Sequence, residues 1–205
     1  RALVLCALAG CPVPENLSDS DDTRVLREAL STSGRLVNVG HAGTAMRFLT
    51  AYFALKGGVR ELTGSERMKQ RPVQVLVDAL RELGASITYM GDEGFPPLWI
   101  TSAPLQGGRS LSLDASVSSQ YVSALMMIAP LLPGGLTLDV EERIVSATYI
   151  RMPAGMMRLF GVDVRLEGEK IIIPEKGYIP VSLRVESDWT AASYFYEMLS
   201  IVGQG

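Results

Sequence analysis

The chain has 205 residues, of which 47% are hydrophobic and 20% charged, so it can bury a sizeable core and lacks the composition of a disordered protein. Its formal net charge is -3 and it has no long basic run, which argues against nucleic acid as the main partner. No apolar stretch is long enough to span a membrane, and the two cysteines, Cys6 and Cys11, lack zinc-site spacing and are typical of reduced cytoplasmic thiols.

The first residues resemble the interior of a larger protein, because Arg1 leads directly into an apolar run without a methionine or a signal-peptide pattern. We therefore expect the chain to be a fragment. One pattern, a small polar start followed by an apolar helix and a terminal glycine, occurs four times along it. These segments cover residues 1–10, 44–58, 118–135 and 190–205.

Each of the first three apolar helices is followed by an amphipathic helix, and the second and third copies also contain strands. The predicted unit is strand, helix, strand, helix, strand, strand, and its last two strands form a hairpin. The first copy is shorter than the others by about twenty residues. The amphipathic helices are expected over residues 19–34, 71–85 and 149–162, single strands over 59–64 and 136–141, and hairpins over 86–101 and 162–174.

Three such units are expected to pack around a common axis, which predicts an α/β (α+β) fold with helices inside and sheets outside. The helix N-termini then emerge at one end, where unpaired N–H groups and partial positive charge favour an anion. Two of these starts are marked by Gly43-Thr44 and by Ser118-Ser119-Gln120. A plain N-capping role for Thr44, Ser118 and Ser119 stays open at this point.

Three cations, Arg67, Lys69 and Arg71, crowd the loop before the second amphipathic helix, for which Pro72 suits the first position. A charge run of this kind is usually a solvated face. Because a helix dipole disfavours cations at its N-terminus, however, an anion close by explains them better. Guanidinium groups bind carboxylate and phosphate through two parallel hydrogen bonds, so we interpret this loop as part of an anion site.

Two further residues, one in the loop before the second apolar helix and one in the helix itself, are candidates for a functional role. His41 is the only histidine, and no cysteine lies near it in sequence, so we interpret it as a polar loop residue rather than a metal ligand. Arg47 occupies the first turn of an apolar helix, where we expect a buried ion-pair partner rather than a ligand contact.

Several motifs together resemble one enzyme family. They are GHAGTAMRFL, LTGSERMKQRPVQVLVDALRELGA, SVSSQYVSALMMIAPLL and SDWTAASYF, joined near the N-terminus by RALVLCALAG and LSDSDDTRVL. The family is 5-enolpyruvylshikimate-3-phosphate synthase, and the resemblance extends over almost the whole chain. It implies two similar domains, each of three βαβαββ units, with the active site in the cleft between them. Residues 1–186 would then form the N-terminal domain, and residues 187–205 would be the first helix of the second.

The resemblance implies transfer of the enolpyruvyl group of phosphoenolpyruvate to the 5-hydroxyl of shikimate 3-phosphate, a step of aromatic amino acid biosynthesis that needs no metal or organic cofactor. It also implies two small-molecule substrates, no nucleic-acid or membrane partner, a monomeric full-length enzyme and a cytoplasmic location. The residues that it assigns to phosphoenolpyruvate are Gly43, Thr44, Arg71 and Gln120. Those that it assigns to shikimate 3-phosphate are Arg1, Ser118, Ser119, Gln120, Ser146 and Tyr149.

The chain departs from the family at several positions. His41 stands where the family usually has asparagine, Phe48 replaces a common proline, and Ala147-Thr148 replace a Lys-Pro pair. The family's second half supplies the acidic groups for proton transfer, and the 205 residues do not include it. We therefore expect no catalytic residue in this fragment, no transferase activity from it alone and at most weak binding of shikimate 3-phosphate.

Three alternatives remain. UDP-N-acetylglucosamine enolpyruvyl transferase shares the fold but typically carries a reactive cysteine ahead of its own Arg-Pro, and residues 63–72 contain none. An RNA 3′-phosphate cyclase of related fold needs a nucleotide-accepting histidine, for which His41 lies in the wrong context. A non-catalytic anion-binding or scaffold domain of the same fold also stays open, because the acid/base half is not in the sequence.

Overall fold

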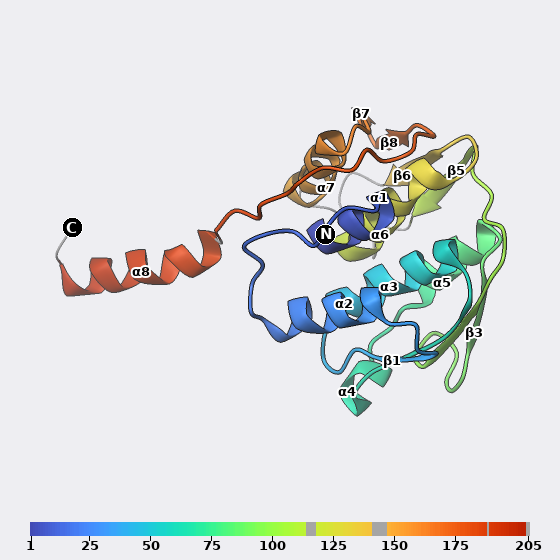
Figure 1. Ribbon diagram of the computed structural model, residues 1–205, viewed down its shortest axis with the longest axis horizontal. Coiled ribbons are helices and arrows are strands. Elements are labelled where there is room, and N and C mark those ends of the chain that lie inside the picture. Colours follow the sequence, from blue (N-terminus) through green and yellow to red (C-terminus); the bar gives the residue numbers. More distant parts are fainter. Residues whose placement is uncertain (114–117, 141–146, 188, 204–205) are drawn as a thin grey trace.

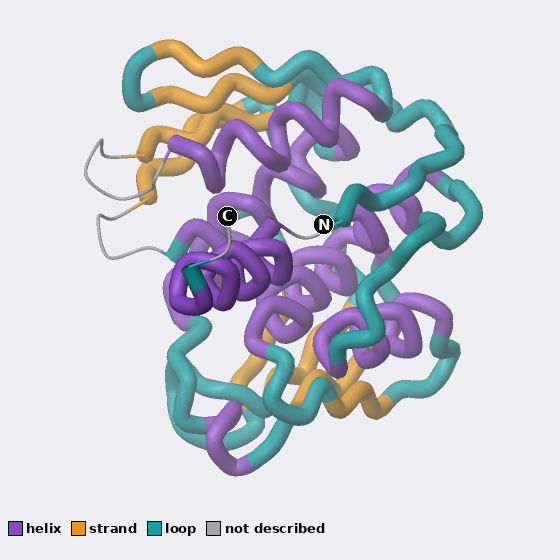
Figure 2. The backbone as a smooth tube through the Cα atoms, turned by 90° about the vertical axis from the view of Figure 1, so that its left-hand side faces the viewer, coloured by secondary structure: helices purple, strands orange, loops and turns teal. Residues whose placement is uncertain are grey.

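Two four-stranded sheets lie on opposite sides of a layer of helices in the computed structural model (Figure 2). Their strand orders, β1-β2-β4-β3 and β5-β6-β8-β7, are the same topology repeated. In each sheet the first two strands of the order are parallel and the remaining neighbours are antiparallel. The structure describes residues 1–113, 118–140, 147–187 and 189–203.

The two sheets belong to two full copies of the predicted unit, so the predicted order of elements is confirmed for both. The first copy runs β1, α3, β2, α5, β3, β4 and the second runs β5, α6, β6, α7, β7, β8. The strands are β1 (Leu36–Asn38), β2 (Val59–Thr63), β3 (Ser86–Tyr89), β4 (Leu98–Thr101), β5 (Arg109–Leu113), β6 (Leu136–Val140), β7 (Arg165–Glu167) and β8 (Lys170–Ile173). The helices are α3 (Gly43–Lys56), α5 (Gln74–Glu82), α6 (Ser119–Ile128) and α7 (Ala147–Leu159).

Helices α1 (Ala2–Ala9) and α2 (Asp21–Ser31) represent the first unit, in which the described residues form no strand beyond one isolated bridge between Glu15 and Arg184. Helix α2 lies within the predicted range 19–34, and its N-cap Ser20 accepts a hydrogen bond from the Thr23 amide at 3.4 Å. In place of a sheet, the segment after α1 lies along the segment after β8. There the Glu15 amide donates to the Leu183 carbonyl at 2.9 Å.

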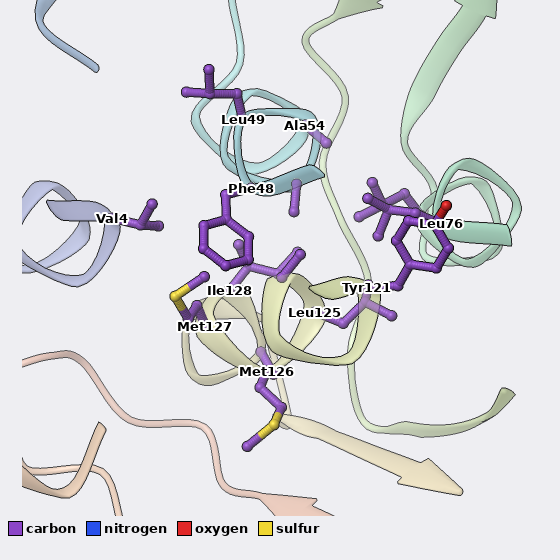
Figure 3. Close-up of a cluster of buried hydrophobic side chains, with 14 of the residues drawn as sticks. Val4, Phe48, Leu49, Ala54, Leu76, Tyr121, Leu125, Met126, Met127 and Ile128 are labelled. Atoms are coloured by element: carbon purple, nitrogen blue, oxygen red, sulfur yellow. The ribbon is translucent and has the colours of Figure 1, made fainter. Parts of the chain in front are cut away.

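The core forms where α1, α3 and α6 meet, and their residues are apolar on nearly all sides, as expected for an inner layer. Phe48 extends from α3 toward α6 and is only 1% exposed (Figure 3). Val4 of α1 and Ile128 of α6 belong to the same buried cluster (Figure 3). Helices therefore lie inside and sheets outside, which confirms the predicted fold class.

Three details differ from the sequence prediction. A short helix, α4 (Glu66–Lys69), lies in the cationic loop, and a 3-10 turn, η1 (Ala129–Leu131), follows α6. Helix α5 begins at Gln74, so Pro72 is not in its first turn as predicted. The reason is tertiary: the Val73 amide donates to the Gly94 carbonyl at 2.9 Å, which ties this segment to a distant loop directly before the helix.

The last helix, α8 (Trp189–Val202), extends away from the other elements (Figure 1). Its large apolar side chains are exposed, among them Phe195 at 69% and Ile201 at 78%. Among the described residues, no helix combines the length and the apolar character needed to cross a membrane.

Candidate functional site

The first turns of α3 and α6 meet, as the repeated units predict. The Gln120 side-chain amide donates to the Thr44 hydroxyl at 3.1 Å and joins the two helix starts. At the start of α3 the N-cap is Ala42, and no side chain in the described part of the chain caps this helix. Its first amides are therefore left for an external acceptor, as in helix-terminus anion sites. Ser118 differs, because its hydroxyl caps α6 by accepting from the Gln120 amide at 3.3 Å.

Gly43 lets the guanidinium of Arg71 lie against the start of α3. A methyl group at Gly43 would collide with Arg71 Nη1 and would lie 2.9 Å from Arg71 Cζ. It would also lie 2.8 Å from Arg47 Nη1. The backbone at this position is thus accessible only because the residue has no side chain. Gly43 and Arg71, which the resemblance assigns to one substrate, are in contact.

Arg47 supports the contact between Gly43 and Arg71 and is only 5% exposed. Its Nη1 donates to the Gly43 carbonyl at 2.8 Å, and its Nη2 donates to the Pro72 carbonyl at 3.5 Å. The expected ion pair is wrong, because these partners are carbonyl oxygens and no carboxylate among the described residues pairs with Arg47. The buried guanidinium therefore adds uncompensated positive charge beneath Gly43.

A polar pocket lies beside this point, between the loop before α3 and the cationic loop. Its volume is about 450 Å³, and it is lined by His41, Arg67, Met68 and Arg71. Lys69 is not in this lining and instead forms an ion pair with Glu66 at 2.8 Å. Of the three predicted cations, two therefore border one pocket and the third is neutralised. No carboxylate from the described ranges lines the pocket, so its chemistry favours an anionic ligand.

A second pocket, of about 370 Å³, is lined mainly by apolar side chains together with Arg1, Thr44 and Asp22. Arg1 Nη2 donates to the Ser123 hydroxyl at 3.3 Å, and that hydroxyl donates to the Ser119 carbonyl at 2.8 Å.

The Arg1 guanidinium also lies 5.6 Å from the centre of the Phe48 ring. Burial lowers the pKa of Arg1, while the nearby Tyr149 raises it. The Arg1 Nε is buried and has no hydrogen-bond partner among the described residues.

The structure thus gathers most of the residues assigned from sequence, at the joined starts of α3 and α6. Tyr149 lies in the first turn of α7 and is 48% exposed, and Ser146 lies outside the described residues. The support from Ser123 and Phe48 was not predicted from the sequence. No group of three or more His, Cys, Asp or Glu side chains in the described ranges is placed to hold a metal ion.

Comparison with known proteins gives one family. The family model described as EPSP synthase (3-phosphoshikimate 1-carboxyvinyltransferase) matches residues 12–204. A 3-phosphoshikimate 1-carboxyvinyltransferase of Bacteroides fragilis is 47% identical over 206 residues, which cover 100% of this chain and 50% of that protein. One from Sulfurovum sp. is 40% identical over 233 residues, covering 99% and 54%. The chain spans about half the length of the curated relatives it matches.

Solved structures agree on the fold. The EPSP synthase of Acinetobacter baumannii superimposes with a TM-score of 0.78 at 21% identity, covering 95% of this chain and 49% of that one. The enolpyruvyl transferase NikO of Streptomyces tendae gives a TM-score of 0.60 at 14% identity, covering 95% and 51%. At these identities the likeness concerns the fold alone.

Two of the relatives differ in the number of alignment positions needed to cover this whole chain. The Bacteroides fragilis alignment spans 206 positions for this chain of 205 residues, so it is almost free of gaps. The alignment with the Actinobacillus pleuropneumoniae relative needs 237 positions for the same whole chain. That relative therefore carries residues within the aligned region that this chain lacks, which fits a first unit without its own sheet.

Proposed function

The chain belongs to the EPSP synthase family, and we propose from this premise that it supplies the N-terminal half of the site that transfers an enolpyruvyl group from phosphoenolpyruvate to the 5-hydroxyl of shikimate 3-phosphate. Both substrates are anions, and phosphate is the leaving group. The observation that carries the proposal is the contact between Gly43 and Arg71 at the start of α3. Thr44, the next residue of α3, accepts a hydrogen bond from Gln120 and so connects this contact to the start of α6.

The pocket lined by Arg67 and Arg71 is proposed to take one of the two substrates. Phosphoenolpyruvate would bind beside Gly43, with its charge on Arg71 and on the free amides at the start of α3. The residues proposed to bind shikimate 3-phosphate are Arg1, Ser118, Ser119, Gln120, Ser146 and Tyr149. Thr44 lines the second pocket and accepts a hydrogen bond from Gln120, and this pair is proposed to set the spacing between the acceptor hydroxyl and the donor carbon.

The role of this half is binding and orientation. The reaction adds the 5-hydroxyl oxygen to C2 of phosphoenolpyruvate while a proton goes to C3, and then eliminates phosphate as C3 loses a proton. Holding two anions at a fixed separation removes much of the entropic cost of their encounter. The proton transfers are proposed to come from a second domain, whose first helix is proposed to be α8.

A titration followed by complementation tests the proposal. Shikimate 3-phosphate is added to the isotopically labelled chain, and the amide signals of Ser119 and Gln120 are followed by NMR. We expect weak saturable binding, no turnover by the chain alone, and turnover once a polypeptide covering the missing half of a family member is added. Binding without turnover under complementation would instead support an anion-binding scaffold, and turnover by the isolated chain would contradict the proposed division of roles.

A further inference from the structure

His41 is carried on a loop that the backbone fixes on both sides. The Ser65 amide donates to the Gly40 carbonyl at 2.9 Å, and the Ala42 amide donates to the Val39 carbonyl at 3.0 Å. Gly40 has a φ of 56°, a left-handed conformation that glycine adopts without strain. The imidazole is therefore attached to a defined position at the edge of the pocket that it lines with Arg67 and Arg71.

The imidazole is also fixed through one of its nitrogens. His41 Nδ1 lies 2.9 Å from the hydroxyl oxygen of Ser65. The same oxygen accepts a hydrogen bond from the Met68 amide at 3.3 Å, because Ser65 is the N-cap of α4. The Ser65 hydroxyl still has its proton to donate to Nδ1, and in that arrangement the neutral ring carries its own proton on Nε2.

This geometry accommodates a second proton without rearrangement. In the charged ring, Nδ1 becomes a donor, and the Ser65 oxygen has a further lone pair with which to accept from it. When Ser65 donates to the neutral ring, Nε2 carries a proton in both states. Protonation therefore changes the charge that His41 presents at the pocket while leaving its hydrogen-bonding pattern at Nε2 the same.

We propose that His41 is a titratable anion-binding residue, which strengthens the hold of this pocket on an anionic donor as the pH falls. The charged groups around it are Arg67 of α4 and Arg71, with the buried Arg47 beneath Gly43. The carboxylate of Glu66 is held by Lys69. An anion bound in the pocket favours the charged ring over the neutral one, so protonation and binding are linked. The identity of the anion as the enolpyruvyl donor rests on the proposed function.

Sulfate is a suitable probe, because it stays a dianion across the titration range of an imidazole, whereas phosphate changes its own charge there. Sulfate is titrated into the 205-residue chain at constant ionic strength, at pH 5.5 and at pH 8.5, and the affinity is measured by NMR. We expect binding to be about three- to tenfold tighter at pH 5.5, a modest factor because the pocket is open to solvent. Since His41 is the chain's only histidine, its imidazole signals are unambiguous. Sulfate should shift the midpoint of its titration to higher pH.

His41→Asn is the matched variant, because an amide keeps an N–H donor at this place but does not titrate. We expect H41N to bind sulfate with the same affinity at both pH values. Arg71→Gln should weaken sulfate binding at both pH values and so locate the anion. In Ser65→Ala, the ring nitrogen shifts of His41 should show a mixture of the two neutral tautomers, because the group that selects Nε2 is removed.

The proposal is overturned if H41N retains the pH dependence of the native chain, if sulfate leaves the His41 titration unmoved, or if sulfate does not bind at either pH. These outcomes are separable from a failure of the proposed function. Shikimate 3-phosphate binding and complementation report on the two-substrate site and do not require a charged His41. A pH-dependent sulfate site in a chain that fails both of those assays would leave this inference standing and remove the proposed transferase role.

Discussion

The hydroxyl of Tyr121, on α6, donates to the carbonyl oxygen of Pro72 at 2.6 Å. Pro72 directly follows Arg71 in the chain, so a residue of one unit fixes the segment that carries the key cation of another. Arg47 of α3 points at the same carbonyl and lies 5.7 Å from the centre of the Tyr121 ring. The position of Arg71 is thus determined by both inner helices.

Tyr121→Phe should weaken anion binding without unfolding the chain. Removing the hydroxyl leaves the Pro72 carbonyl short of its best donor, at a cost of about 1 kcal/mol in the free energy of unfolding. Sulfate affinity should fall as well, because the Arg71 segment is held less firmly. Tyr178→Phe is the control, since the Tyr178 hydroxyl donates to the Met127 carbonyl at 2.7 Å, away from the residues that line the pocket. Equal sulfate affinities in the two variants would contradict this role of Tyr121.

Gly43→Ala should displace the guanidinium of Arg71, because the new methyl group occupies its place. We expect sulfate affinity to fall by about tenfold, the scale of one lost charge-assisted contact. Gly155→Ala is a matched control: Gly155 lies in α7, and no atom lies within 4 Å of the methyl group that would be added. That change should stabilise the chain by up to about 1 kcal/mol and leave sulfate binding unchanged. Normal sulfate affinity in G43A would refute the contact argument.

The bond between Gln120 and Thr44 should appear as a coupling between two helices. Gln120→Ala and Thr44→Val are combined in a double-mutant cycle, with urea unfolding as the first readout and shikimate 3-phosphate binding as the second. A part-buried neutral hydrogen bond predicts a coupling of about 0.5–1.5 kcal/mol in the free energy of unfolding. Strictly additive effects in both readouts would show that the two helix starts are merely neighbours.

Cys6 should make the stability of the chain depend on pH in the alkaline range. Burial raises the pKa of this thiol from 9.0 to about 11, with the neighbouring Cys11 adding to the shift. The unfolded chain therefore loses this proton at lower pH than the folded chain, and the free energy of unfolding falls as the pH rises from about 9 toward 11. Cys6→Ala should remove this contribution, measured as the difference between the urea midpoints of variant and native chain at pH 8 and pH 10. Identical pH dependence in both would contradict it.

The repeated order of helices and strands was predictable from the sequence, because it depends on local signals. Apolar helices ending in glycine and strands of alternating polarity each specify structure within a few residues. The start of α5 was not predictable in this way. Its place depends on the Gly94 carbonyl and the Tyr121 hydroxyl, which are remote in sequence and outweigh the local preference of Pro72 for a first helical turn.

The candidate site was likewise predictable where local signals decide it and not where remote contacts do. Its residue types were identified by resemblance, and the joining of two helix starts followed from the repeat. The partners of Arg47 and the pairing of His41 with Ser65 were not foreseen, because each connects positions that only the folded chain brings together. A local signal did exist for Ser65, since a serine directly before a short charged helix is a typical N-cap.

The absence of a sheet beside α2 in the described residues leaves this helix on an open flank of the molecule. Only Leu26 and Ala29 of its side chains are fully buried, whereas most residues of α3 are. Amide hydrogens protected chiefly by their own helix exchange for deuterium through small local fluctuations. Those of an inner helix exchange only when the chain unfolds cooperatively. Deuterium uptake should therefore begin in α2 and reach α3 and α6 last, so that local unfolding of the chain starts in the unit without its own sheet.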